Sequence, residues 1–177
     1  LVHGLGDEAD TWRDVFLALA RQRRVIAVDL PGFGRSALPQ QPVSIPVYVN
    51  TLLELLDTLN LPPVTLVGHS LGAILVQQLA LENPPRATNL VMISGGLAAG
   101  KAALSLELLL FLIPGIGEWA YNHLRRDPQV AYQTLAPYYA HLEQLPQDTR
   151  DFLLLRVNQR VWSDQQRRAF LGALRSL

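Results

Sequence analysis

The chain has 177 residues, of which 49% are apolar, and its 15 basic residues balance its 15 acidic residues. This composition is typical of a globular protein long enough to form one domain with its own core. The charge balance excludes a field of one sign that would favour nucleic acid or an anionic membrane, and the lack of cysteine excludes disulfides, thiolate metal ligands and thiol nucleophiles. We expect no metal ion and no other cofactor.

Two periodicities alternate in the first half of the chain. Three short, apolar and β-branched runs are typical of strands buried on both faces of a parallel sheet: residues 24–30, 64–68 and 90–94. Three helical patterns precede or separate these runs: residues 8–22, 47–60 and 71–83. The alternation predicts an α/β fold, with a mostly parallel sheet and flanking helices. By the same pattern, "LVH" at residues 1–3 is the end of one more strand.

The second half has a different character, because residues 97–177 contain no convincing buried strand. Its helical segments are interrupted by prolines, which cannot continue a helix: Pro114, Pro128, Pro137 and Pro146. Residues 163–177 have an amphipathic helical pattern, with Ser163 or Asp164 as the N-cap. We therefore expect a core at residues 1–96 and a helical subdomain at residues 97–177.

The longest apolar run is "ALSLELLLFLIPG", residues 103–115. It contains Glu107 and ends at a proline and a glycine, well short of the roughly 20 residues that a membrane-spanning helix needs. A membrane span is therefore not expected, and a helix packed on an apolar partner is the preferred interpretation. An interfacial helix is disfavoured, because basic residues do not flank the run.

The pentapeptide "GHSLG", residues 68–72, carries the strongest chemical signal. An apolar strand is predicted before it and an apolar helix after it, which is the context of the G-x-S-x-G nucleophile elbow. Gly68 and Gly72 leave room for the strand and the helix to approach each other at a strained serine turn. We therefore interpret Ser70 as a nucleophile, and the alternative is an ordinary turn that contains a serine.

A second glycine turn, "HGLG", follows the first predicted strand. Gly4 and Gly6 leave backbone N–H groups unshielded, and acyl transfer needs N–H donors for the oxyanion. We expect two donors, Leu71 directly after the nucleophile and Leu5 in this turn, with Gly4 or Gly6 as alternatives to Leu5. The other interpretation is an ordinary glycine turn beside a structural His3.

The segment "VDLPGFGRS", residues 28–36, is interpreted as a further turn. Asp29 precedes Leu-Pro-Gly, and Gly32 and Gly34 suit backbone shapes that other residues resist. We therefore assign Asp29 to the turn rather than to catalysis as an acid.

Together, "HGLG", "DLPGFGRS" and "GHSLG", in this order and spacing, resemble the α/β-hydrolase fold superfamily, in its lidded esterase and lipase-like branch. The resemblance covers residues 1–95 with specific motifs, and the rest only loosely, as the helical lid that this family inserts. It implies that Ser70 is the nucleophile, that Leu5 and Leu71 form the oxyanion hole, and that residues 97–177 are the lid.

A serine nucleophile also needs a histidine base and an acid, which follow the serine in this family's chain order. No such pair is evident. The four histidines belong to the motifs (His3 and His69) or to the expected lid (His123 and His141), and neither Asp127 nor Asp164 is better placed as the acid. Where some family members carry the acid, this chain has Ser94 and Gly95. We therefore expect a fragment that lacks the first strands and the acid and histidine, and little or no turnover by this chain alone.

The expected function is that of a serine hydrolase that cleaves a carboxylic ester through an acyl-enzyme. The apolar residues 104–113, with Ile116, Trp119 and Tyr121, favour a small apolar substrate, although they would equally pack the lid against itself. The alternatives are a non-enzymatic, receptor-like ligand-binding protein, and a thioesterase, C–C hydrolase or perhydrolase. Ser rather than Asp at position 70 argues against dehalogenase and epoxide-hydrolase chemistry. The oligomeric state and the cellular compartment are left open.

Overall fold

The computed structural model of the chain describes residues 1–96 and 106–177. The first range contains strands β1 (Val64–His69) and β2 (Ala87–Ile93), and helices α1 (Arg13–Ala20), α2 (Ile45–Thr58) and α3 (Leu71–Glu82). The second range, here called the helical half, contains α4 (Leu106–Leu112), α5 (Ile116–His123), α6 (Pro128–Gln133), α7 (Gln147–Trp162) and α8 (Asp164–Arg175). Short 3-10 turns lie at Ala9–Trp12, Pro84–Arg86, Leu124–Arg126, Ala136–Tyr138 and Leu142–Gln144.

The sheet of the first range is parallel. β1 pairs with β2 in a register that places Gly68 opposite Met92. On the other side of β1, Val2 forms a parallel bridge to Gly68, and Val28 forms a parallel bridge to Val2. The order across the sheet is therefore Val28, Val2, β1 and β2. This arrangement confirms the predicted α/β fold with a mostly parallel sheet and flanking helices.

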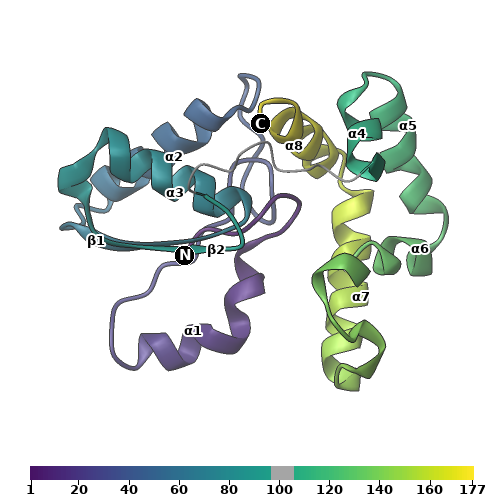
Figure 1. Cartoon of the computed structure of the whole chain (residues 1–177), viewed down its shortest axis with the longest axis horizontal. Helices are drawn as coiled ribbons and strands as arrows, with labels where there is room; N and C mark the ends of the chain where they lie inside the picture. Colours follow the sequence, from purple (N-terminus) through teal and green to yellow (C-terminus); the bar gives the residue numbers. More distant parts are fainter. Residues whose placement is uncertain (97–105) are drawn as a thin grey trace.

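Helices lie on both faces of the sheet (Figure 1), with α2 and α3 on one face and α1 on the other. Four apolar side chains of α3 are fully buried: Ala73, Leu75, Val76 and Leu79. They are buried because α3 lies between the two strands and α2, and contacts both. By contrast, Val15 and Leu19 of α1 are exposed, so α1 contributes little to the core.

The expected strands are not all formed as predicted. Within the described residues, the run at 24–30 forms a ladder bridge only at Val28, which pairs with Val2. The expectation that the run at 90–94 is buried on both faces is wrong, since Leu90 and Val91 of β2 are 37% and 43% exposed. Within the described residues β2 pairs only with β1, which leaves its other edge open.

The helical half packs on the core through α8, which lies between the sheet and helices α4 and α5 (Figure 1). Ala169 and Ala173 of α8 belong to the main core cluster. A Cβ atom added at Gly32 would lie 2.5 Å from the Cβ of Ala169, so the turn at Gly32 and α8 are in close contact. The side chain of Ser163 accepts the N–H of Gln166 at 3.2 Å, which confirms one of the two predicted N-caps.

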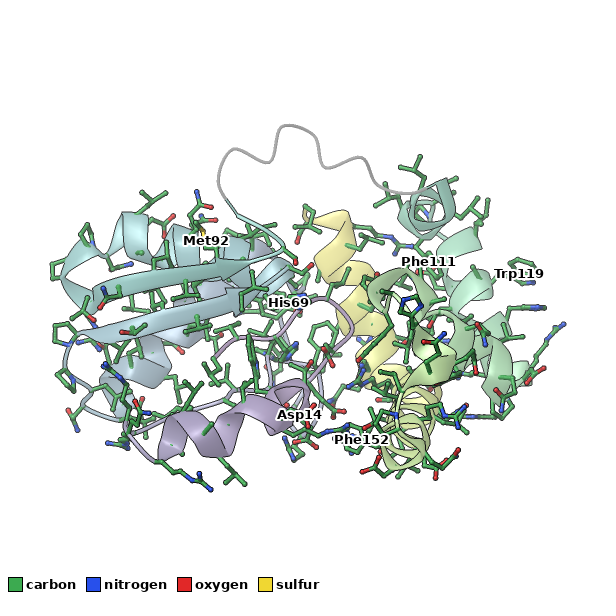
Figure 2. All side chains as sticks on the ribbon, turned by 60° about the horizontal axis from the view of Figure 1, so that its bottom comes forward. Asp14, His69, Met92, Phe111, Trp119 and Phe152 are labelled. Atoms are coloured by element: carbon green, nitrogen blue, oxygen red, sulfur yellow. The ribbon has the colours of Figure 1, made fainter. Side chains whose placement is uncertain are left out.

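The boundary expected after Gly96 and the first residues of the run at 103–115 lie outside the described residues. Farther along that run, Leu109 and Leu110 are exposed, and Trp119 of α5 points away from the sheet (Figure 2). Within the two described ranges, no helix combines the length and the hydropathy that crossing a membrane requires.

Candidate active site

Ser70 occupies a strained turn between β1 and α3. Its backbone angles are φ 51° and ψ −115°, a conformation that a residue with a side chain adopts at a typical cost of about 1–3 kcal/mol. The Ser70 N–H donates to the carbonyl of Ile93 at 2.8 Å, and the Ser70 carbonyl accepts from the N–H of Ala73 at 3.0 Å. These two bonds tie the turn to β2 and to the first turn of α3, so the surrounding structure holds the strain.

The two motif glycines have the steric role that the sequence predicts. A Cβ atom added at Gly68 would lie 2.3 Å from the carbonyl oxygen of Gly72, and one added at Gly72 would lie 2.4 Å from the carbonyl oxygen of Val2. Both contacts are with backbone atoms, which no side-chain rotation can relieve. Glycine at these positions therefore permits the close approach of β1, α3 and residues 1–3 that creates the turn.

The predicted oxyanion turn lies beside this serine. A Cβ atom added at Gly4 would lie 3.2 Å from the Cβ of Ser70. The N–H of Asp7 donates to the carbonyl of Gly4 at 3.3 Å, and Gly6 has φ 74°, so residues 4–7 form a tight turn, here called the Gly4–Asp7 turn. The structure therefore brings Ser70 together with the "HGLG" residues, although more than sixty positions separate them in the sequence.

The backbone N–H groups of the two predicted oxyanion donors have no acceptor among the hydrogen bonds of the described residues. Leu71 is the first residue of α3, where an N–H has no partner within the helix. Among the hydrogen bonds of the described residues, neither the Leu71 N–H nor the Leu5 N–H has an acceptor. Donors that lack a partner beside a serine are the arrangement that stabilises a developing oxyanion.

His3 is a structural residue of the turn. It is fully buried, its Nε2 accepts the N–H of Leu30 at 2.9 Å, and its Nδ1 donates to the carbonyl of Gly4 at 2.7 Å. These partners define the neutral tautomer with the proton on Nδ1. Burial lowers the pKa of His3, although the bond to Gly4 partly opposes this effect. With both ring nitrogens bound to the backbone, His3 is not available as a base.

Asp29 also has a structural environment. Its carboxylate accepts the N–H of Ala9 at 2.6 Å, the N–H of Arg35 at 3.0 Å and the Nε of Arg35 at 2.8 Å. Burial by itself would raise the pKa of Asp29, but these hydrogen bonds from Ala9 and Arg35 outweigh it and hold the pKa below its ordinary value. The carboxylate joins the start of the 9–12 turn to residue 35, in agreement with its assignment to a turn.

The remaining candidate acids and histidines do not form a triad with Ser70. Asp127 caps α6 through the N–H of Gln129 at 2.8 Å, and Asp164 pairs with Arg125 at 2.6 Å. His123 stacks on Trp119 with 5.6 Å between ring centroids, and His141 precedes the turn at Leu142–Gln144. Within the described residues, the Ser70 hydroxyl has no hydrogen-bond partner and no group of three potential ligands could hold a metal ion.

The sequence did not predict the buried ionic cluster that lies beside the Gly4–Asp7 turn. Glu8 is only 3% exposed. Its carboxylate accepts hydrogen bonds from two arginines of α7, from Arg156 Nε at 2.7 Å and from Arg160 Nη2 at 2.8 Å. Arg160 Nη2 also lies 2.7 Å from Asp7, and Arg156 Nη2 lies 2.8 Å from Asp10. Two features of the sequence could have indicated the cluster: the acid-rich stretch after "HGLG", and two arginines four residues apart on a predicted helix. Neither feature shows that these two segments pair with each other.

Two surface pockets flank this cluster, and Ser70 lines neither. One, of about 440 Å³, lies between α1 and Arg35 and is lined by Phe16 and Leu17. The other, of about 120 Å³, lies among Glu8, Arg35 and the α7 arginines. Neither of these two pockets is therefore the apolar substrate pocket expected at Ser70.

Known proteins of similar sequence and fold have been identified. The model of the alpha/beta hydrolase fold matches residues 1–174. An uncharacterized protein of Mycobacterium tuberculosis is 35% identical over 130 residues, which covers 66% of this chain and 38% of the relative. The 2-hydroxy-6-oxo-2,4-heptadienoate hydrolase of Pseudomonas putida is 38% identical over 112 residues, which covers 61% of this chain and 38% of the relative.

Among solved structures, the 2-hydroxy-6-oxo-6-phenylhexa-2,4-dienoate hydrolase of a Rhodococcus strain has a similar fold. Its TM-score is 0.75 at 22% identity, and the match covers 99% of this chain and 61% of the other. The chain thus spans about three fifths of that protein, and less than two fifths of the two curated relatives.

Proposed function

The chain belongs to the alpha/beta hydrolase fold family, and we propose that the protein carrying it is a serine hydrolase that cleaves a carboxylic ester through an acyl-enzyme on Ser70. One observation carries the proposal: Ser70 has φ 51° between β1 and α3, and Gly4 lies against it. Backbone strain of this kind clusters at functional sites, and at Ser70 it coincides with the glycine turn beside the side chain. The fold alone hosts many reactions, so the argument rests on this site.

In the proposed reaction, Ser70 Oγ attacks the carbonyl carbon of the ester while a base takes the hydroxyl proton. The carbonyl oxygen becomes an oxyanion, which accepts the N–H groups of Leu5 and Leu71; one such donor typically accounts for a factor of about 10²–10³ in rate. The alcohol leaves with the proton from the base, and water then releases the acid from Ser70. No described histidine is placed to serve as the base, so the mechanism requires one that the described residues do not supply.

The helical half is proposed to belong to a lid, which the sequence assigns to residues 97–177; residues 97–105 lie outside the described residues. α8 contacts both the Gly4–Asp7 turn, where Gln166 Nε2 donates to the Gly6 carbonyl at 3.0 Å, and the turn at Gly32. A small apolar ester is the proposed substrate, because the run at residues 104–113 is almost wholly apolar in sequence. Trp119 faces away from the sheet (Figure 2), so it is not assigned to the substrate site.

A second candidate substrate class is a 2-hydroxy-6-oxo dienoate. It is favoured by the Pseudomonas putida relative, which is named a hydrolase of such a compound and is 38% identical over 112 residues. A serine nucleophile suits both substrate classes, whereas the serine at position 70 disfavours mechanisms that need a carboxylate nucleophile there.

The test is labelling of the whole protein by a fluorescent fluorophosphonate, followed by turnover of a p-nitrophenyl ester series and of a dienoate. We expect covalent labelling and hydrolysis in the parent protein, and loss of both in Ser70→Ala. The matched control is Ser94→Ala, since Ser94 is also a serine with positive φ directly after a strand (φ 52°). Labelling that persists in Ser70→Ala contradicts the proposal, and a parent protein with neither labelling nor turnover favours a receptor-like role.

A further inference from the structure

The buried carboxylate of Glu8 connects the proposed oxyanion turn to the helical half. Arg156 and Arg160 are one helical turn apart on α7, and both donate hydrogen bonds to Glu8. They lie 148 and 152 positions after it in the sequence. Only 20% and 13% of these two arginine side chains are exposed, against 4% of the Glu8 side chain. Water therefore screens these ion pairs poorly, and a buried carboxylate that loses its partners is strongly destabilised.

Glu8 is also rigidly linked to the Gly4–Asp7 turn. Its N–H donates to the Asp7 carboxylate at 3.0 Å, and the same carboxylate lies 2.7 Å from Arg160. The next N–H, that of Ala9, is held by Asp29 at 2.6 Å. A displacement of Glu8 is therefore transmitted to residues 4–7, because the backbone between them has no free segment.

A second contact from α7 supports the same attachment. The guanidinium of Arg13, at the start of α1, stacks on the ring of Phe152 with 3.7 Å to its centroid. Figure 2 shows Asp14 of α1 and Phe152 of α7 on facing sides of the same junction. Phe152, Arg156 and Arg160 follow one another at four-residue spacing, so a single face of α7 contacts the stretch from Asp7 to Arg13.

We propose that Glu8 is a positioning residue, held by Arg156 and Arg160, that keeps the Gly4–Asp7 turn where the Leu5 N–H meets the oxyanion. The inference rests on the proposed function. Because both arginines belong to α7, the geometry of the oxyanion hole would then depend on how the helical half packs against the core. A residue with this role affects the transition state more than the bound substrate, since the oxyanion exists only during reaction.

The experiment compares Glu8→Gln with the parent in the whole protein. We expect kcat on a p-nitrophenyl ester to fall about 10- to 100-fold, as misplacement of a catalytic group does, with KM changed by less than about threefold because ground-state binding is untouched. The affinity for a boronic acid, which forms a tetrahedral adduct on the serine, should fall by the same factor as kcat. Amide hydrogen exchange of residues 4–7 should become faster under conditions in which the variant stays folded.

The matched control is Glu118→Gln, which breaks the ion pair of Glu118 with Arg175 (2.9 Å) inside the helical half, and it should leave kcat and the exchange of residues 4–7 unchanged. If Glu8→Gln does not fold, Arg160→Lys keeps the charge but loses the two-pronged contact and should show a smaller decrease of the same kind. Unchanged kcat with unchanged exchange at residues 4–7 overturns the inference, as does a decrease in kcat without faster exchange. Activity that survives Ser70→Ala would contradict the proposed function, independently of Glu8. In that case, the hydrogen exchange of residues 4–7 still tests whether Glu8 positions the turn.

Discussion

For Gly72→Ala, helix propensity predicts an increase in the free energy of unfolding, whereas the tertiary packing predicts a decrease. Gly72 lies in the first turn of α3, where alanine in place of glycine would stabilise an isolated helix by about 1 kcal/mol. In the folded chain, the new Cβ would lie 2.4 Å from the Val2 carbonyl oxygen and 2.6 Å from that of His3. Both neighbours are backbone atoms, so α3 or residues 1–3 must move.

That movement strains the bonds that hold residues 1–3 on β1. The Val2 N–H donates to Val67 at 2.8 Å, and the Val2 carbonyl accepts the N–H of His69 at 3.0 Å. A typical net value of about 1 kcal/mol for each hydrogen bond, with about 1–3 kcal/mol for overpacking, outweighs the gain in helix propensity. We expect a net loss of about 2–4 kcal/mol in the free energy of unfolding, or a decrease of about 5–15 °C in Tm.

The assay is urea unfolding followed by circular dichroism, with thermal melting as a second measurement. Gly115→Ala is the matched control, because no atom of the described residues lies within 4 Å of its added Cβ and its φ of 84° opposes the change. It should lose about 1–2 kcal/mol, the backbone cost alone. A Gly72→Ala protein as stable as the parent, or more stable, would show that helix propensity dominates and would refute the close-approach argument for the elbow glycines.

Two further predictions concern pH and capping. Because burial lowers the pKa of His3 in the folded state, the unfolded chain takes up this proton first as the pH falls below about 6.5, and the free energy of unfolding should decrease there by at most about 1.4 kcal/mol per pH unit. An NMR titration should find the His3 imidazole still neutral below that pH, and a midpoint near 6.5 would contradict the expectation. Ser163→Ala removes the acceptor of the Gln166 N–H and should destabilise the chain by about 1 kcal/mol in urea unfolding, whereas Ser163→Asn should retain nearly all of the stability.

The amino-acid sequence by itself determined the features that depend on neighbouring residues. The glycines around Ser70 indicate a strained turn wherever a strand leads directly into a helix, and the structure has φ 51° at Ser70. Helix limits follow from equally local causes, such as the prolines after α3 and the Ser163 cap of α8. The alternation of periodicities predicted a parallel sheet, because parallel neighbours require a crossover helix.

The tertiary structure alone decided the features that depend on distant partners. Glu8 and Arg160 are 152 positions apart, and no local pattern distinguishes a buried acid with two arginines from a solvated one. The apolar run of β2 predicted burial, but Leu90 and Val91 are both exposed. Burial and pairing are properties of the surroundings, so the sequence identified the serine turn, whereas only the fold showed which helix holds the loop beside it.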